Sequence, residues 1–359
     1  MKLLKIDKHT KIYYTSTNFL FDISKEISRY NYVIKLSIIF NKLFKTDYKS
    51  SDLLYWSLII GNDINDPLIT KANIKIFNLL ELPLNKLNIW NKYIDNYVNK
   101  INNKIIIHKF KYDIIDNNNN NNNQITILCL INNKTHKYKL LKIKYNLIYI
   151  LQIIASFLRY ESLNFLSGLS GGIDPAKYKN LNKVYNANVE LFSSYFNSTL
   201  PYYFGLFYDL EHQFGCLGNY FKSKIKKGFY VANPPFENKI MNLFFDKAIC
   251  ELSKYNIAIY ITLPCWDIKD REKLNKLCIN DKLLSNNYND LFNINILNIY
   301  TIINYLFCKS KYFYFDYLQN KFINFVPTNV RVICSDKFRI KLNNINYIMS
   351  NMHNNAIIN

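Results

Sequence analysis

The chain is poor in glycine, proline and cysteine for its 359 residues. Its seven cysteines form no Cys-x-x-Cys pair, and its five histidines are equally dispersed. An odd cysteine count without zinc-ligand spacing argues against a disulfide framework and a metal site. We therefore expect reduced thiols in an intracellular protein that binds no metal.

Long apolar runs are also missing. The most apolar stretch is residues 145–158, which is interrupted by Asn146 and Gln152. It is too short to span a bilayer and predicts a buried helix. The first residues, Met1–Lys5, soon become charged and form no signal-peptide core. These features predict a protein of the nucleus, the cytoplasm or a viral replication compartment, neither secreted nor membrane-bound.

Acidic residues are outnumbered, with 26 Asp and Glu against 46 Lys and Arg, so the formal charge is +20. Such a charge permits a polyanionic partner such as RNA or DNA. Only five of the basic residues are Arg, however, and Lys, Asn, Ile, Tyr and Phe are all abundant. An AT-rich coding sequence produces the same bias, so the charge alone does not indicate nucleic-acid binding.

The pattern along the chain changes at an asparagine run, residues 117–123, which predicts a solvated, disordered loop. Helical spacing around Trp56 and Trp90 predicts a mainly helical region before it. Residues 125–131 and 138–143 flank a turn and predict a hairpin. The predicted division is a helical domain at 1–116, the loop at 117–123, a hairpin or connector at 124–149, an α/β domain at 150–345 and a tail at 346–359.

The second half has the rhythm of a doubly wound α/β domain. The apolar run Gly228–Ala232 predicts a strand, and the apolar side chains that recur every fourth residue from Ile240 to Leu252 predict an amphipathic helix. The nearly continuous apolar run Ile257–Leu263 is typical of a strand covered on both faces. Strand-like runs at 298–307 and 330–334 extend the predicted sheet.

Seven of the eight glycines fall between Gly168 and Gly228, directly before this strand and helix. A chain so poor in glycine keeps it where a Cβ is not tolerated, as in tight turns or beside a ligand. The clustering therefore favours a binding region built from loops at strand ends. The alternative is a loop-rich connector.

The turn Asn233-Pro234-Pro235-Phe236 between this strand and helix is the main catalytic candidate. The N6 amine of adenine is a poor nucleophile because its lone pair is delocalised into the ring. The Asn233 side-chain carbonyl and the Pro234 backbone carbonyl are suited to accept its two hydrogens, while Phe236 stacks on the base. Consecutive prolines keep these acceptors preorganised. The alternative is an ordinary rigid turn.

Three further side chains are candidates for substrate contacts. Lys222 and Lys224 belong to an alternating lysine pattern that suits phosphate contacts or a solvated face. Trp266 follows the buried strand and is a candidate for stacking on a base or cap, or for a place in the core.

Several ordered segments resemble a known family. They are Phe157-Leu158-Arg159-Tyr160, Leu191–Asn197, Asp209-Leu210-Glu211, Phe214-Gly215-Cys216-Leu217-Gly218, Asn233–Phe236 and the strand end Pro264-Cys265-Trp266. This set resembles the phosphorylated-CTD-interacting-factor family, the cap-specific adenosine N6-methyltransferases, over residues 145–270. The Asn-Pro-Pro-Phe turn alone is shared by many amino-group methyltransferases, and the preceding Phe-Gly-x-x-Gly segment makes the resemblance specific.

The resemblance implies a Rossmann-like domain that uses S-adenosylmethionine and acts on the cap-adjacent adenosine of mRNA. It implies that Asp209 or Glu211 holds the donor's ribose hydroxyls or amino group, and that Gly215 and Gly218 let the backbone approach its methionine part. Arg159 would pair with the donor's carboxylate, and Asn197 would line the same pocket. The WW domain of animal members is not visible in this sequence.

Two other functions remain open at this point. One is methylation of adenine in DNA or in internal RNA, without a cap. The other is a catalytically silent RNA-binding scaffold of the same fold, although a silent relative is free to lose the intact Asn233–Phe236 turn.

Overall fold

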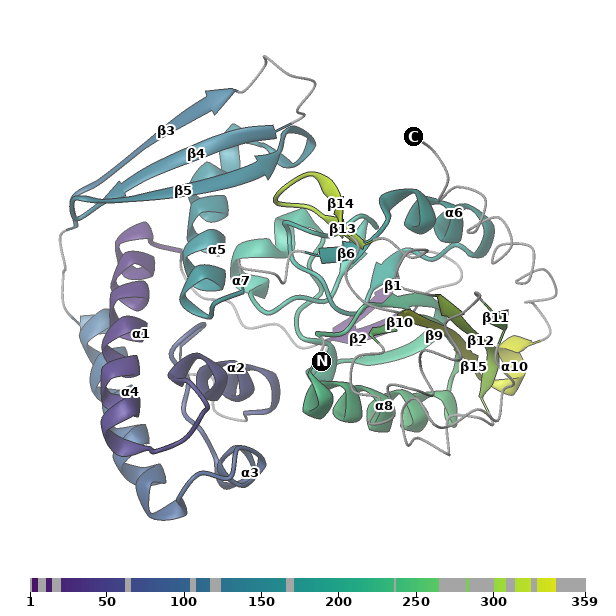
Figure 1. Ribbon diagram of the computed structural model, residues 1–359, viewed down its shortest axis with the longest axis horizontal. Coiled ribbons are helices and arrows are strands. Elements are labelled where there is room, and N and C mark those ends of the chain that lie inside the picture. Colours follow the sequence, from purple (N-terminus) through teal and green to yellow (C-terminus); the bar gives the residue numbers. More distant parts are fainter. Residues whose placement is uncertain are drawn as a thin grey trace. The chain divides into compact units, whose positions relative to one another are not determined.

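The computed structural model describes residues 2–5, 11–14, 21–61, 66–103, 108–116, 124–165, 171–235, 237–264, 282–283, 300–307, 314–323 and 328–339. The predicted asparagine loop and C-terminal tail lie outside these ranges. The chain divides into two compact units, each built from separate segments (Figure 1). The first comprises Met1–Thr15, Gly171–Gly205 and Ser223–Asn359, and the second Ser16–Ser170 and Leu206–Lys222.

The first unit is a mixed α/β structure. Its helices are α6 (Pro175–Tyr185), α8 (Asn238–Leu252) and α10 (Asp336–Arg339). Its strands are β1 (Lys2–Lys5), β2 (Lys11–Tyr14), β6 (Gly171–Ile173), β7 (Val189–Glu190), β8 (Tyr202–Tyr203), β9 (Lys224–Ala232), β10 (Asn256–Pro264), β11 (Lys282–Leu283), β12 (Thr301–Phe307), β13 (Tyr314–Asp316), β14 (Lys321–Ile323) and β15 (Thr328–Cys334).

The main sheet has the strand order β1-β2-β9-β10-β15-β12-β11, with β7 also paired to β9 and to β8. The strands β8, β7, β9 and β10 are parallel to one another. The strand β15 runs antiparallel between β10 and β12, so these two strands are parallel to each other. The predicted α/β class and the predicted strands at 228–232, 257–263 and 330–334 are confirmed.

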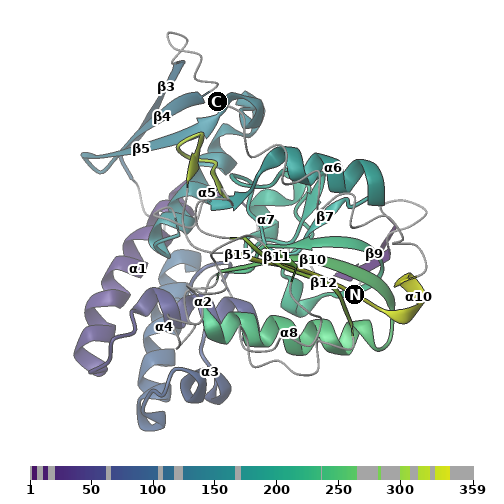
Figure 2. The same cartoon turned by 45° about the vertical axis from the view of Figure 1, so that its right-hand side comes forward.

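Helices cover both faces of this sheet. Figure 2 shows α6 on one side of β9 and β10 and α8 on the other. The side chains of α8 that recur every fourth residue, Ile240, Phe244, Ala248 and Leu252, are buried as the sequence predicts. Burial on both faces explains why β10 is almost continuously apolar from Ile257 to Leu263.

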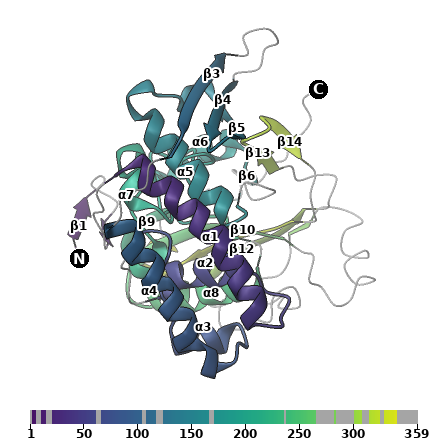
Figure 3. The ribbon, with the colours of Figure 1, turned by 90° about the vertical axis from the view of Figure 1, so that its left-hand side faces the viewer.

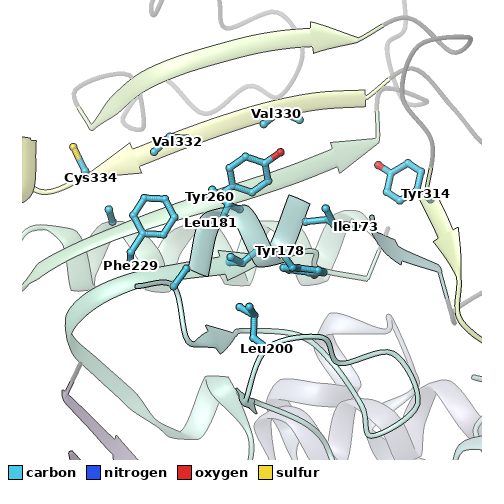
Figure 4. Close-up of a cluster of buried hydrophobic side chains, with 13 residues drawn as sticks. Ile173, Tyr178, Leu181, Leu200, Phe229, Tyr260, Tyr314, Val330, Val332 and Cys334 are labelled. Carbon is cyan, nitrogen blue, oxygen red and sulfur yellow. The ribbon is translucent and has the colours of Figure 1, made fainter. Parts of the chain in front are cut away.

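The face of the sheet opposite α8 packs into a continuous core. Tyr178 and Leu181 of α6 join Phe229, Tyr260 and Val332 from three neighbouring strands (Figure 4). Alternate residues of each strand point to this face, which accounts for the two-residue spacing of the cluster within β9, β10 and β15. This core fixes the carboxyl ends of the parallel strands.

The first turn of α6 holds a buried lysine. Lys177 is 8% exposed, and burial lowers its pKa to about 8, although Asp174 opposes the shift. The charge also lies near the positive end of the helix macrodipole, where a cation is unfavourable. A lysine pKa below its ordinary value means that the unfolded chain binds the proton more tightly, so stability rises as the pH increases from about 8 to about 10.5.

We therefore expect Lys177→Met to raise the free energy of unfolding by roughly 1–3 kcal/mol at pH 7, and by less at pH 9.5. Urea unfolding at both pH values measures the two differences. Lys179→Met is the matched control, because Lys179 lies exposed on the same helix. A gain from Lys177→Met that is equal at both pH values would contradict the expectation.

The second unit is mainly helical. Its helices are α1 (Ile23–Leu43), α2 (Ser50–Ile60), α3 (Ile74–Leu79), α4 (Leu87–Asn103), α5 (Ile150–Ser162) and α7 (Tyr208–Glu211), with short 3-10 turns at Leu84–Lys86, Lys142–Lys144, Leu147–Tyr149, His212–Phe214 and Tyr220–Lys222. The long helix α1 packs against both α4 and α5 (Figure 3). None of the described helices is long and apolar enough to cross a membrane.

A small antiparallel sheet accompanies these helices. It consists of β3 (Phe110–Asp116), β4 (Gln124–Ile131) and β5 (Lys134–Leu141). The predicted hairpin is confirmed, and its turn residues Asn132 and Asn133 both have positive φ, as a two-residue type I′ turn requires. Tyr138 of β5 stacks on Phe157 of α5, which attaches the sheet to the helices.

The apolar run at 145–158 is not one buried helix. The helix α5 begins at Ile150, and the preceding residues form a 3-10 turn in which Leu147 is 60% and Ile148 82% exposed. Asn146 accepts a hydrogen bond from the Ile148 backbone N–H. This side-chain cap favours a turn at the beginning of the apolar run, before the helix α5 starts. The prediction of the helix start was wrong for this reason.

Candidate functional site

The Asn-Pro-Pro turn directly follows β9 and leads into α8. Pro234 is buried, while Asn233 and Pro235 are half-buried. The Pro235 carbonyl accepts a hydrogen bond of 2.7 Å from the Glu237 backbone N–H. The Glu237 carboxylate then caps α8 by accepting from Lys239 N–H at 3.3 Å and Ile240 N–H at 3.2 Å. These bonds and the two prolines hold the turn in one conformation. Phe236 lies outside the described residues.

The carboxamide of Asn233 is held from both ends. Its Nδ2 donates to the Gly171 carbonyl at 3.3 Å, and its Oδ1 accepts from the Thr262 hydroxyl at 3.1 Å. A carbonyl oxygen can only accept, so the Gly171 contact assigns the NH₂ group to that side and Oδ1 to the other. Oδ1 keeps a second lone pair for another donor.

The loop after β7 lies beside this turn. The Leu191 N–H donates to the Val231 carbonyl at 2.7 Å, which continues the pairing of β7 with β9. Asn197 Oδ1 accepts from Ser194 N–H at 2.7 Å and from the Ser193 hydroxyl at 3.0 Å, and so closes the loop. The buried Glu190 carboxylate accepts from two backbone N–H groups at the far end of the loop, those of Thr199 and Leu200. Asn197 thus lies within the loop that follows β7, and Asn233 directly follows the neighbouring strand β9.

The Asn-Pro-Pro turn after β9 and the loop after β7 lie at the edge of the sheet where α/β proteins bind ligands. From β7 the chain continues to β8 on one side, and β9 lies on the other side of β7. The order of the parallel strands therefore reverses at the carboxyl ends of β7 and β9. Open α/β sheets bind ligands at such a switch point, outside the carboxyl ends of the strands.

Arg159 and Asp209 are paired within the second unit. Two parallel hydrogen bonds join them, from Nη1 to Oδ1 at 2.8 Å and from Nη2 to Oδ2 at 2.6 Å. The Glu26 carboxylate accepts from Arg159 Nε at 2.8 Å and Nη2 at 2.7 Å. Arg29 links Glu26 to Asp66, which completes a buried ionic network of five residues.

Burial opposes the charged form of Arg159, which is 1% exposed, but the carboxylates of Asp209 and Glu26 outweigh it and raise its pKa well above the ordinary value. Its guanidinium also lies over the ring of Phe207, 5.0 Å from the centroid. Glu211 is fully buried, and burial together with Glu211 raises the pKa of Tyr160. Arg159 and both candidate carboxylates are thus integrated into the interior of this unit.

Gly215 and Gly218 have φ of 95° and 89°, a region that residues with a Cβ rarely adopt. The backbone conformation therefore accounts for both glycines, with or without a ligand beside them. Lys222 is half-buried, and burial lowers its pKa to about 8, whereas Lys224 is exposed at the start of β9. Trp266 lies outside the described residues.

Two polar partners of the candidate residues were not predicted from the sequence. Glu26 contacts Arg159 from 133 residues away, and no local pattern indicates such a pair. Thr262 was not singled out because it lies within the apolar run of β10. A hydroxyl in such a run could have indicated a polar partner, because a buried hydroxyl needs a hydrogen bond.

The family comparison bears on the same part of the chain. Residues 129–281 match the family described as phosphorylated CTD interacting factor 1 WW domain. The match points to the family that the ordered segments resemble. It covers under half of the chain and includes every candidate residue from Arg159 to Trp266. Its description names a WW domain, which does not fit the prediction of a chain without one. A comparison with curated proteins finds no match.

Proposed function

We propose that this chain transfers a methyl group from S-adenosylmethionine to N6 of adenosine in RNA, and that its acceptor is the adenosine next to the mRNA cap. The observation that carries the proposal is the oriented Asn233 carboxamide at the carboxyl end of β9, directly before two prolines. The family match over 129–281 supports it, because the resemblance to this family implies cap-specific adenosine methylation.

The proposed chemistry needs little acid or base. S-adenosylmethionine supplies, when bound, an electrophilic methyl group on a sulfonium sulfur. Asn233 Oδ1 and the Pro234 carbonyl accept the two N6 hydrogens, so the nitrogen turns its lone pair out of the ring and toward the methyl carbon. The donor would supply the methyl group and keep the S–C bonding electrons on sulfur, the N6 lone pair would form the new N–C bond, and one N6 proton would pass to water. Positioning by the rigid turn provides most of the acceleration.

Several residues are proposed to hold the polar groups of the cofactor. In the first unit, the Asn197 loop lies at the switch point and is proposed to line the donor pocket. In the second unit, Asp209 is proposed to hold the ribose hydroxyls, with Glu211 as the alternative. Gly215 and Gly218, which both have positive φ, are proposed to let the backbone approach the methionine part of the donor. Because Arg159 is committed to Glu26 and Asp209, we assign it the positioning of Asp209 in place of a direct bond to the donor's carboxylate.

The acceptor is proposed to be single-stranded or splayed RNA, since a stacked base cannot reach such a turn. Lys222 and Lys224 are proposed phosphate contacts, and Phe236 and Trp266 are proposed stacking residues. A capped mRNA partner and a nuclear or cytoplasmic location, including a viral replication compartment, belong to the same proposal.

A comparison of capped and uncapped RNA tests the function. The two oligonucleotides share one sequence that starts with 2'-O-methyladenosine, and mass spectrometry of the digested nucleosides measures the product. We expect N6-methylated nucleoside from the capped RNA at a rate at least about tenfold higher, a difference of 1.4 kcal/mol in the barrier. Single-stranded DNA is the third acceptor.

Each other outcome points to a different function. Equal rates on capped and uncapped RNA would remove the cap preference, and preferential DNA methylation would identify a DNA enzyme. If calorimetry detected no binding of S-adenosylmethionine, the scaffold function would replace the enzymatic one.

A further inference from the structure

The strand β10 carries one threonine hydroxyl toward the candidate site. Thr262 is fully buried between Ile261 and Leu263, at a position where valine would have the same shape. A buried hydroxyl costs free energy unless it is hydrogen-bonded. The Thr262 Oγ1 lies 3.1 Å from Asn233 Oδ1 and 3.4 Å from the Ala232 carbonyl, so the shorter contact is to the carboxamide.

The other end of the carboxamide rests on a firmly placed strand. The strand β6 pairs with β13, which aligns Gly171 with Asp316 and Ile173 with Tyr314. The Tyr317 hydroxyl donates to the Ile173 carbonyl at 2.9 Å. A Cβ on Gly172 would lie 2.8 Å from the Tyr317 ring, so this close approach requires glycine. The Gly171 carbonyl is therefore a fixed acceptor for Asn233 Nδ2.

These two anchors act on the orientation of the amide. Gly171 accepts only, and the Thr262 hydroxyl supplies the matching donor for Oδ1. Rotation of the amide by half a turn would place Oδ1 beside the Gly171 carbonyl, where two acceptors meet, and would break the bond that the Thr262 hydroxyl donates to Oδ1. Without the hydroxyl, a single contact of 3.3 Å holds the group.

We propose that Thr262 is a positioning residue for methyl transfer. Its hydroxyl holds Asn233 Oδ1 so that the second lone pair of this oxygen accepts an N6 hydrogen of the bound adenosine. Thr262 neither gains nor loses a proton during the reaction. The inference rests on the proposed function and extends it to a residue outside the Asn-Pro-Pro-Phe turn.

The test compares Thr262→Val and Thr262→Ser with the unchanged chain. Valine keeps the shape and removes the hydroxyl, while serine restores the hydroxyl. We expect Thr262→Val to lower kcat for methyl transfer about tenfold, the effect of one hydrogen bond, with KM for RNA and the Kd of the donor unchanged. Thr262→Ser is expected to recover kcat to within about threefold of the unchanged chain.

The matched control is Thr328→Val on the neighbouring strand β15. Thr328 is equally buried, and its hydroxyl donates to the Tyr314 hydroxyl at 3.1 Å. We expect it to leave kcat unchanged. The proposal is overturned if Thr262→Val keeps the original kcat, raises KM instead, or is not rescued by serine.

A second readout separates this inference from the proposed function. Thermal unfolding of Thr262→Val, Asn233→Ala and the double variant reports the hydrogen bond without any reaction. If the Tm shift of the double variant is smaller than the sum of the two single shifts, the hydrogen bond between Thr262 and Asn233 is supported. If the shifts are additive, the inference is overturned. If the protein without any substitution methylated no adenosine, the proposed function would be refuted, whatever the unfolding experiment showed.

Discussion

Replacing Asn233 with alanine is expected to reduce methyl transfer to capped RNA by at least about a hundredfold. The substitution removes the Oδ1 acceptor and leaves only the Pro234 carbonyl to draw the N6 lone pair out of the ring. It should leave the Kd of S-adenosylmethionine within about threefold, because Asn233 is assigned to the acceptor amine. Transfer of labelled methyl groups and calorimetry measure the two quantities.

Asn242→Ala is the matched control for this experiment. Asn242 is exposed on α8, the helix that follows the turn, so its removal tests the loss of an asparagine amide outside the site. We expect unchanged turnover and an unchanged Tm from this control. Turnover at the original rate in Asn233→Ala would refute the role of the carboxamide in methyl transfer.

The second large effect concerns stability. We expect Arg159→Met to lower the free energy of unfolding by about 3–5 kcal/mol, since it leaves the carboxylates of Glu26 and Asp209 buried without their shared cation. Urea unfolding followed by circular dichroism measures the loss. Because Asp209 is proposed to hold the donor's ribose, the folded fraction should also bind S-adenosylmethionine at least about tenfold more weakly.

Lys71→Met gives the corresponding surface control. Lys71 forms an ion pair of 2.8 Å with Asp95, and both side chains are partly exposed. Exposed pairs contribute about 0–1 kcal/mol because water screens them. A loss from Arg159→Met as small as that from Lys71→Met would show that the buried network contributes little to stability.

Features of the fold that depend on neighbouring residues were predictable from the sequence, and features that depend on distant residues were not. The strands at 257–263 and 330–334, the helix with Ile240 and Phe244 and the hairpin turn at Asn132 were predictable because side-chain periodicity and turn chemistry act over a few residues. The start of α5 was missed because one asparagine cap overrides the apolar composition of the preceding residues. The burial of Asp209 and Glu211 was not predictable from the sequence, because it depends on residues far away in the chain.

Local sequence determined where the Asn-Pro-Pro turn stands, between a strand and an amphipathic helix, because proline geometry and hydrophobic spacing need no distant partner. Only the tertiary structure decided which way the Asn233 carboxamide faces and which acids neutralise Arg159. Those outcomes depend on Gly171, Thr262 and Glu26, residues far away in the chain that burial brings within hydrogen-bonding distance. The free energy of a buried polar group is set by such partners, and a sequence pattern does not record them.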